Sequence, residues 1–197
     1  MLTKQDAFRI VREKLDTDFD ILEEITIEKD YGWLVFPQTK AYIETRASKD
    51  MAIGPGGILV EKHGGKTIRF STAYSIELNL KIYEAGYLDH DNYDLVITQI
   101  TSLEQTLHFL ACLSINYVKP EFESGITWRI PKSFTMLQLR LILAKLPCRF
   151  NLGKLYFKWE VLEQMKTTSS LKYELVPNSG FKNDYYLDRI TRHKFFK

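Results

Sequence analysis

Within the first 36 residues the spacing of apolar side chains switches once, from the period of a helix to that of a strand. This switch limits the fold that the chain can adopt. Apolar residues recur at helical spacing from Ala7 to Leu15, behind a capping box that Thr3 and Asp6 provide. From Ile21 onward apolar and polar residues alternate, which is typical of a half-buried strand. A helix that leads directly into strands predicts an α+β unit.

Turn residues divide the rest of the N-terminal segment into two hairpins and a second helix. A glycine turn joins the strands of each hairpin, and Ser75 can cap the second helix, which Gly86 ends. This pattern predicts a helix, a four-stranded antiparallel sheet and a helix. The expected elements are a helix over 4–15, strands over 21–28, 33–36, 58–62 and 66–70, a loop over 37–57 and a helix over 76–85.

A polar, turn-like segment at 88–92 marks the expected boundary between two units. Beyond it the period again switches between strand and helix, which predicts a second small α+β unit. Thr101 with Glu104 forms a capping box, and Thr135 caps a later helix. The expected domains are 1–90 and 93–197. The strands of the second are expected over 93–100, 115–118, 126–130, 148–150 and 171–175, with helices near 103–111, 136–145 and 159–165.

Charge is divided unevenly between these two units. The whole chain carries 27 Lys and Arg against 25 Asp and Glu, a net charge of +2. Residues 1–93 hold 12 of the bases and 16 of the acids, whereas residues 94–197 hold 15 and 9. The net charge of the whole chain argues against a strong general affinity for nucleic acid or membranes. The charge of each half, taken separately, is still compatible with a charged partner. The basic part ends in a tail, 189–197, whose mixture of bases and aromatics is found in single-stranded nucleic-acid binders and in loosely docked tails.

Seven carboxylates crowd the segment 16–30, hereafter the acidic segment, against the single base Lys29. Carboxylates at this density repel one another unless basic groups compensate them. Two interpretations remain open: an acidic face that steers a basic partner protein into contact, and a solvated connection between helix and strand. The candidate partner-binding residues are Asp16, Asp18, Asp20, Glu23, Glu24, Glu28 and Asp30.

The cysteines and the lack of long apolar runs favour a cytoplasmic protein. Cys112 and Cys148 lie in apolar segments, so we expect both to be reduced and buried. The N-terminus carries charges every few residues, and no apolar run approaches the roughly 18 residues that a membrane-spanning helix needs. We expect neither a signal peptide nor a transmembrane helix, and no membrane partner.

No motif in the sequence predicts catalysis, a cofactor or a metal. The glycine-rich stretch 53–57 precedes a strand, whereas a phosphate loop needs a following helix N-terminus. The segment 16–20 matches the start of a calcium loop, but Ile21 and Ile27 occupy the positions that need glycine and glutamate. The four histidines have no metal-ligand spacing. We expect a protein that is not an enzyme and that has no cofactor and no metal.

Three segments follow one another in an order typical of a known family. They are the helix TKQDAFRIVREKL, the stretch ILEEITIEKDYGWLVFPQTKAYIET and the stretch GPGGILVEKHGGKTIRFSTAYSIELNLKIYE. With this set, residues 1 to about 90 resemble the immunity protein 35 domain, also called the YrhB-like family, which consists of small α+β proteins of bacterial polymorphic toxin systems. The resemblance implies an immunity protein that neutralises a cognate toxin by stoichiometric protein–protein binding. Residues 93–197 lie outside it.

Two other classes of function stay open at this point. A chaperone-like holdase would present a large apolar patch, for which Trp33, Phe36 and Tyr42 are the candidates. A nucleic-acid accessory protein would use the basic half, although the modest net charge argues against it. If the partner is a toxin nuclease, its substrate groove is basic and the carboxylates of the acidic segment would mimic phosphate.

Overall fold

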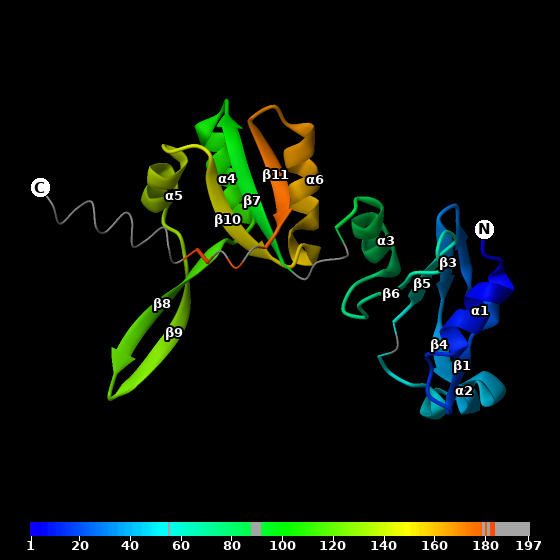
Figure 1. Cartoon of the computed structure of the whole chain (residues 1–197). Coiled ribbons are helices and arrows are strands. Elements are labelled where there is room, and N and C mark those ends of the chain that lie inside the picture. Colours follow the sequence, from blue (N-terminus) through cyan, green and yellow to red (C-terminus); the bar gives the residue numbers. More distant parts are fainter. Residues whose placement is uncertain (55, 88–91, 179, 181, 184–197) are drawn as a thin grey trace, which may run out of the picture. The chain divides into compact units, whose positions relative to one another are not determined.

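The computed structural model of the chain describes residues 1–54, 56–87, 92–178, 180, 182 and 183. The chain divides into two compact units, Met1–Ala85 and Gly86–Lys197, hereafter unit 1 and unit 2 (Figure 1). Both combine helices with antiparallel sheets, so the predicted α+β class is confirmed. Most of the predicted boundary at 88–92 and the whole basic tail lie outside the described residues. Within the described part, none of the helices is long and apolar enough to cross a membrane.

An antiparallel sheet of four strands forms the centre of unit 1. In chain order the unit contains α1 (Lys4–Arg12), β1 (Phe19–Ile21), the 3-10 helix η1 (Glu23–Ile25), β2 (Ile27–Lys29), β3 (Gly32–Val35), β4 (Pro37–Thr39), α2 (Lys40–Thr45), the 3-10 helix η2 (Ser48–Asp50), β5 (Ile58–Glu61), β6 (Thr67–Arg69) and α3 (Ile76–Glu84). The strand order is β2-β3-β5-β6, and β1 pairs separately with β4. The two predicted hairpins are β2–β3 and β5–β6.

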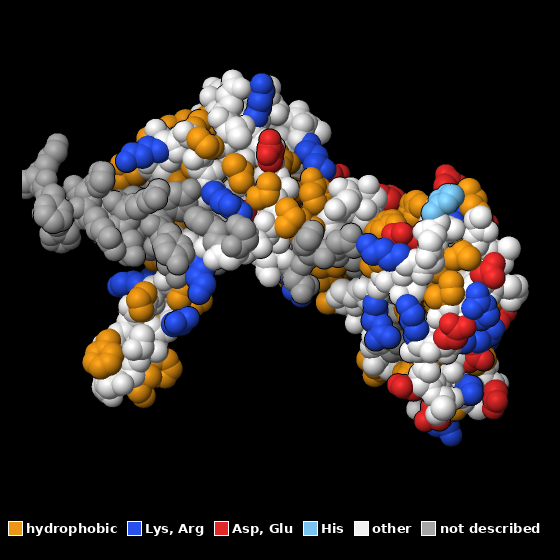
Figure 2. All heavy atoms as spheres, in the orientation of Figure 1, with side chains coloured by type: hydrophobic (Ala, Val, Ile, Leu, Met, Phe, Trp, Pro, Cys, Tyr) orange, Lys and Arg blue, Asp and Glu red, His pale blue; other side chains and the backbone are white. Residues whose placement is uncertain are grey.

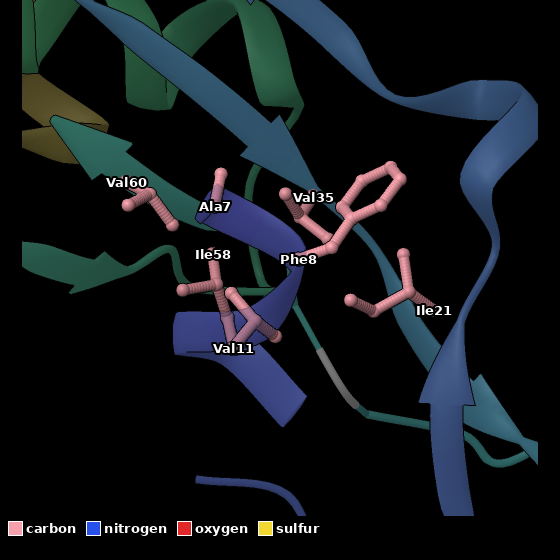
Figure 3. Packing of buried hydrophobic residues seen from close by; sticks show 7 residues of the cluster. All are labelled: Ala7, Phe8, Val11, Ile21, Val35, Ile58 and Val60. Carbon is pink, nitrogen blue, oxygen red and sulfur yellow. The ribbon is translucent and has the colours of Figure 1, made fainter. Parts of the chain in front are cut away.

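Helix α1 packs on strands β3 and β5 and closes the core of unit 1 (Figure 3). Its predicted capping box is present: the Asp6 N–H donates to the Thr3 hydroxyl, and the Thr3 N–H donates to the Asp6 carboxylate at 2.9 Å. The apolar side of the helix is directed at the sheet, as its helical spacing predicts. The buried cluster consists of Ala7, Phe8, Val11, Ile21, Val35, Ile58 and Val60.

The single strand predicted over 21–28 is wrong, because the segment is broken into β1, η1 and β2. The alternation fails at its start, where Ile21 and Leu22 are buried in succession. It fails again further along, where Ile25 and Ile27 are 48% and 37% exposed. Only β2 joins the four-stranded sheet, where it is an edge strand. The acidic segment therefore passes through three short elements instead of one strand.

The loop predicted over 37–57 also contains regular structure, namely β4, α2 and η2. Gln38 is buried, and its side chain bonds both backbone groups of Ala52, at 2.7 Å to the N–H and 3.2 Å to the carbonyl. Thr39 then caps α2 by accepting from the N–H of Tyr42 at 3.1 Å. The Gln38 side chain pairs with Ala52 as a neighbouring strand would, and no local sequence pattern predicts such a pairing. Thr39 before α2, in contrast, is a recognisable N-cap residue.

The sheet of unit 2 has three antiparallel strands with its longest strand in the middle. The elements are β7 (Tyr93–Ile100), α4 (Leu103–Cys112), β8 (Asn116–Glu123), β9 (Ile126–Ser133), α5 (Met136–Leu143), β10 (Cys148–Gly153), the 3-10 helix η3 (Tyr156–Lys158), α6 (Trp159–Thr167) and β11 (Leu171–Pro177). The strand order is β10-β7-β11. Helices α4 and α6 contact each other and lie against this sheet (Figure 1).

The helix caps of unit 2 agree with the sequence in one case and differ in the other. Thr135 caps α5, as predicted, and Gln138 completes a capping box that was not predicted. Helix α4 is capped by Ser102, which accepts from the Gln105 N–H, and not by Thr101. The Thr101 hydroxyl donates instead to the carbonyl of Ser169, a residue that is remote in sequence.

Strands β8 and β9 form a two-stranded ribbon that extends away from the three-stranded sheet (Figure 1). Both strands are longer than predicted, with a register that runs from Asn116 opposite Ser133 to Glu123 opposite Ile126. Ser124 and Gly125 close the tip with φ of 52° and 82°, the conformation that a two-residue hairpin turn of type I′ requires. The ribbon is thus a regular hairpin that pairs with no other described strand.

The two cysteines lie in different environments, and the prediction that both are buried is wrong for Cys112. Cys148 is buried at the start of β10, where desolvation raises the pKa of its thiol to about 12. Cys112 is exposed at the end of α4, with its sulfur 3.7 Å from Nε2 of His108. Since the thiolate is the nucleophile, we expect iodoacetamide at neutral pH to modify Cys112 in the folded chain and Cys148 only after denaturation. Mass spectrometry of the alkylated peptides measures this, and equal rates at both cysteines would contradict it.

Candidate functional site

The acidic segment runs along unit 1 from the connection after α1 to the turn after β2. Six of its seven carboxylate residues are exposed, and Asp20 is half-buried. The seven fall into two groups: four form ion pairs with bases of unit 1, and three form no ion pair within the described part of the chain. The first group is Asp20, Glu23, Glu24 and Glu28, and the second is Asp16, Asp18 and Asp30.

Arg12, in the last turn of α1, holds two of the carboxylates. Its Nε donates to Asp20 at 2.8 Å and its Nη2 donates to Glu23 at 2.7 Å. Burial by itself would raise the pKa of Asp20, but the hydrogen bonds from Arg12 and from the Ile21 N–H outweigh burial, so this pKa is lowered. The hydrogen bonds that Arg12 donates to these two carboxylates raise the pKa of Arg12. Asp20 and Glu23 therefore attach the acidic segment to the opening helix.

Two further bases hold Glu24 and Glu28. Arg46, the left-handed C-cap of α2, lies 2.5 Å from Glu24, and the pKa of Glu24 is lowered first by its own backbone N–H and then by this guanidinium. Lys62 lies 2.7 Å from Glu28 and also 4.8 Å from the ring centre of Trp33. All the compensating bases in these pairs belong to unit 1, so more than half of the acidic segment is neutralised by its own unit.

Asp16, Asp18 and Asp30 are the carboxylates of this segment that form no ion pair with another described residue. The same segment exposes the apolar side chains of Ile25 and Ile27. Red and blue side chains are interspersed over the visible face of unit 1 in Figure 2, in agreement with the pairing of acids and bases. The surface is consequently a mixed one, with unpaired carboxylates and exposed isoleucines rather than a uniform acidic field.

The aromatic residues that a holdase would expose in unit 1 are half-buried. Trp33 packs on the core cluster, and its Nε1 donates to the Leu2 carbonyl at 3.3 Å; Phe36 and Tyr42 are only partly accessible. Large exposed apolar side chains gather instead on the ribbon of unit 2, where Figure 2 shows orange side chains at the tip. They are Phe122, Ile126, Trp128 and Ile130.

Unit 2 contains a buried polar network that the sequence did not predict. Asp94, in the middle of the sheet, is fully buried and accepts two hydrogen bonds from the guanidinium of Arg149, at 2.6 and 2.7 Å. The amides of Asn151 and Asn178 donate to its other oxygen at 3.0 and 2.9 Å. Because this carboxylate is already occupied by donors from three residues, it serves to position Arg149, Asn151 and Asn178.

Asn183 connects this network to the base of the ribbon. Its Oδ1 accepts from the Asn151 N–H at 2.7 Å, and its Nδ2 donates to the Asn116 carbonyl at 2.6 Å and to the Asn151 carbonyl at 3.1 Å. Through Asn183, the described part of the segment after β11 is thereby hydrogen-bonded to both β10 and β8.

A cavity of about 590 Å³ opens where the ribbon, β10 and this segment meet. Its volume lies in the range of small-molecule sites. The lining residues are Asn92, Asn116, Val118, Pro120, Arg129, Asn151, Asn178, Gly180, Lys182 and Asn183. The only local sequence feature that marks it is the recurrence of asparagine near strand ends.

Comparison with models of known protein families, with curated proteins and with solved structures finds no match for this chain. Among the described residues, no group of three or more His, Cys, Asp or Glu side chains could hold a metal ion.

Proposed function

We propose that this protein is a binding protein of the immunity type, which neutralises a cognate toxin protein by forming a stoichiometric complex with it. The resemblance of residues 1 to about 90 to the immunity protein 35 domain supports the class. The observation that carries the proposal is the set of exposed carboxylates Asp16, Asp18 and Asp30, which form no ion pair within the described residues.

The chemistry of this surface favours a basic partner with some apolar character. Unpaired carboxylates attract a basic protein over about 10 Å at moderate ionic strength and raise the rate of encounter. The exposed side chains of Ile25 and Ile27 then supply apolar area that becomes buried in the complex. A toxin nuclease, whose substrate groove binds phosphates, has the required positive charge.

The direct test is to co-express the full chain with the protein encoded by the adjacent reading frame of its genome. We expect that protein to arrest growth when expressed alone, and co-expression to restore growth. We also expect the two chains to elute together in size-exclusion chromatography at a fixed ratio. A toxic neighbour whose effect is unchanged and that forms no complex with this chain would overturn the proposal.

Reversing the charges of Asp16, Asp18 and Asp30 tests whether the acidic segment lies in the interface with the toxin. The variant Asp16→Lys/Asp18→Lys/Asp30→Lys is expected to weaken toxin binding about tenfold or more at low salt, with a smaller loss at high salt. Isothermal titration calorimetry at two ionic strengths measures both. Asp20 and Glu24 are left unchanged because their ion pairs with Arg12 and Arg46 belong to the fold.

The matched control reverses three other exposed carboxylates, Glu44, Glu77 and Glu174, which gives the same change in net charge. We expect it to retain most of the affinity. Equal losses in both triple variants would show that only net charge matters. An unchanged affinity in the first variant would remove the acidic segment from the interface while leaving the co-expression result intact.

A further inference from the structure

We propose that the cavity of unit 2 is a binding site for a phosphorylated small molecule of nucleotide size. This inference rests on the cavity alone and is independent of toxin binding. Its evidence is the charge of the lining, the hydrogen bonds that hold three lining asparagines, and the presence of apolar residues beside a cation.

Among the described residues, the lining carries two basic side chains and no acidic one. Arg129 on β9 and Lys182 after β11 are both exposed, and neither forms an ion pair within the described residues. No Asp or Glu is among the described residues that line the cavity. The nearest buried acid, Asp94, lies behind the wall and is already paired with Arg149. Two cations that form no ion pair within the described part of the chain are suited to a phosphate group, which Arg binds in bidentate fashion and Lys as a point charge.

Hydrogen bonds within the chain hold three of the lining asparagines in place without a ligand. Asn151 and Asn178 are held by Asp94, and Asn183 is held by backbone groups of β8 and β10. Lys182 precedes Asn183 directly in the sequence. A preformed site loses less free energy on binding than one that must be ordered by its ligand.

The remaining wall selects a ligand larger than phosphate alone. Val118 and Pro120 on β8 line the cavity, and Pro120 lies directly opposite Arg129 in the ribbon register. Asn92 and Asn116 add amide groups at the edge, which can hydrogen-bond the polar edge of a base or the hydroxyls of a sugar. An apolar wall beside a cation, together with amides, fits a phosphate that is attached to an organic group.

The test titrates the full chain with the four nucleoside monophosphates, the matching nucleosides, ribose 5-phosphate and inorganic phosphate, using calorimetry. We expect at least one nucleoside monophosphate to bind with a Kd below about 1 mM, and its nucleoside to bind about tenfold more weakly or not at all. We expect inorganic phosphate and ribose 5-phosphate to bind more weakly than the nucleotide, because neither fills the apolar part.

The variant Arg129→Gln/Lys182→Gln is expected to lose about tenfold or more of the nucleotide affinity. Both side chains are exposed, so the fold should tolerate the change, and circular dichroism with thermal unfolding checks this. If the double variant misfolds, the single variant Arg129→Gln gives the same test with a smaller expected loss. The matched control is Lys145→Gln/Lys172→Gln, which removes two exposed charges of unit 2 that do not line the cavity and should leave the affinity unchanged.

Several results would overturn the proposal. They are the absence of binding by all four nucleotides, equal affinity for nucleotide and nucleoside, and equal affinity for nucleotide and inorganic phosphate. An unchanged affinity in the double variant would place the bound nucleotide elsewhere. Much tighter binding of a single-stranded oligonucleotide than of any mononucleotide would make the cavity part of a nucleic-acid surface instead.

Discussion

Replacement of Asp94 by alanine is expected to destabilise unit 2 by about 3 kcal/mol. The carboxylate is fully buried and accepts hydrogen bonds from Arg149, Asn151 and Asn178. Its removal takes a charged partner from Arg149, whose side chain is only 31% exposed, and an acceptor from two amides. Loss of one partner of a buried ion pair costs more than the pair contributes, because the remaining charge stays desolvated.

Urea unfolding of the full chain, followed by hydrogen exchange of the β7, β10 and β11 amides, measures this loss. The variant Asp94→Asn keeps the shape and one acceptor oxygen, so an intermediate loss is expected. A loss below about 1 kcal/mol for Asp94→Ala would mean that water replaces the carboxylate, and that the network does not hold the cavity walls. Because the walls depend on this network, we also expect Asp94→Ala to weaken any ligand of the cavity.

Replacement of Phe8 by alanine is expected to destabilise unit 1 by about 3–5 kcal/mol. The ring has no exposed surface and lies at the centre of the core between α1 and the sheet (Figure 3). The truncation leaves a cavity, and it also removes the ring over which Lys4 and Arg12 lie at 5.3 and 5.7 Å from its centre. Since Arg12 also holds Asp20 and Glu23, loss of the ring should loosen the acidic segment.

Hydrogen exchange of the backbone amides in the full chain shows which unit the Phe8→Ala substitution destabilises. Amides of α1 and β3 should exchange faster in Phe8→Ala, while those of β7 should keep their rates, because the two units have separate cores. The matched control is Phe122→Ala, the same truncation at a side chain that is 76% exposed, where a change within about 0.5 kcal/mol is expected. Equal losses in the two variants would contradict the assignment of Phe8 to the core.

Local periodicity and capping predicted most elements. The predictions that failed did so at residues whose environment is set by contacts with remote parts of the chain. The box at Thr3, the cap at Ser75 and the alternation over 93–100 depend on residues a few positions apart, and all three are present in the structure. The strand over 21–28 failed because Leu22 is buried by contacts from outside its own segment, including the hydrogen bond of its N–H to the Phe36 carbonyl.

The candidate sites depended even more on contacts between remote residues. The density of carboxylates in the acidic segment was visible, but its division into paired and unpaired groups was not, because Arg46 and Lys62 come from other elements. Asp94 falls within an alternating strand, and nothing nearby indicates that Arg149 and Asn178 converge on it. The local sequence pattern therefore indicated the acidic segment of unit 1 as a candidate site, and no local pattern indicated the cavity of unit 2.

The prolines of the ribbon limit how a partner can recognise it. In a two-stranded hairpin both outer edges present backbone groups that could accept another strand, as in amyloid or β-strand addition. Pro120 and Pro131 stand in β8 and β9, and a proline is tolerated in such a ladder where its nitrogen faces outward. Each outer edge thus lacks one N–H donor, so the exposed Trp128 and its neighbours are available for contact through side chains while strand-by-strand polymerisation is disfavoured.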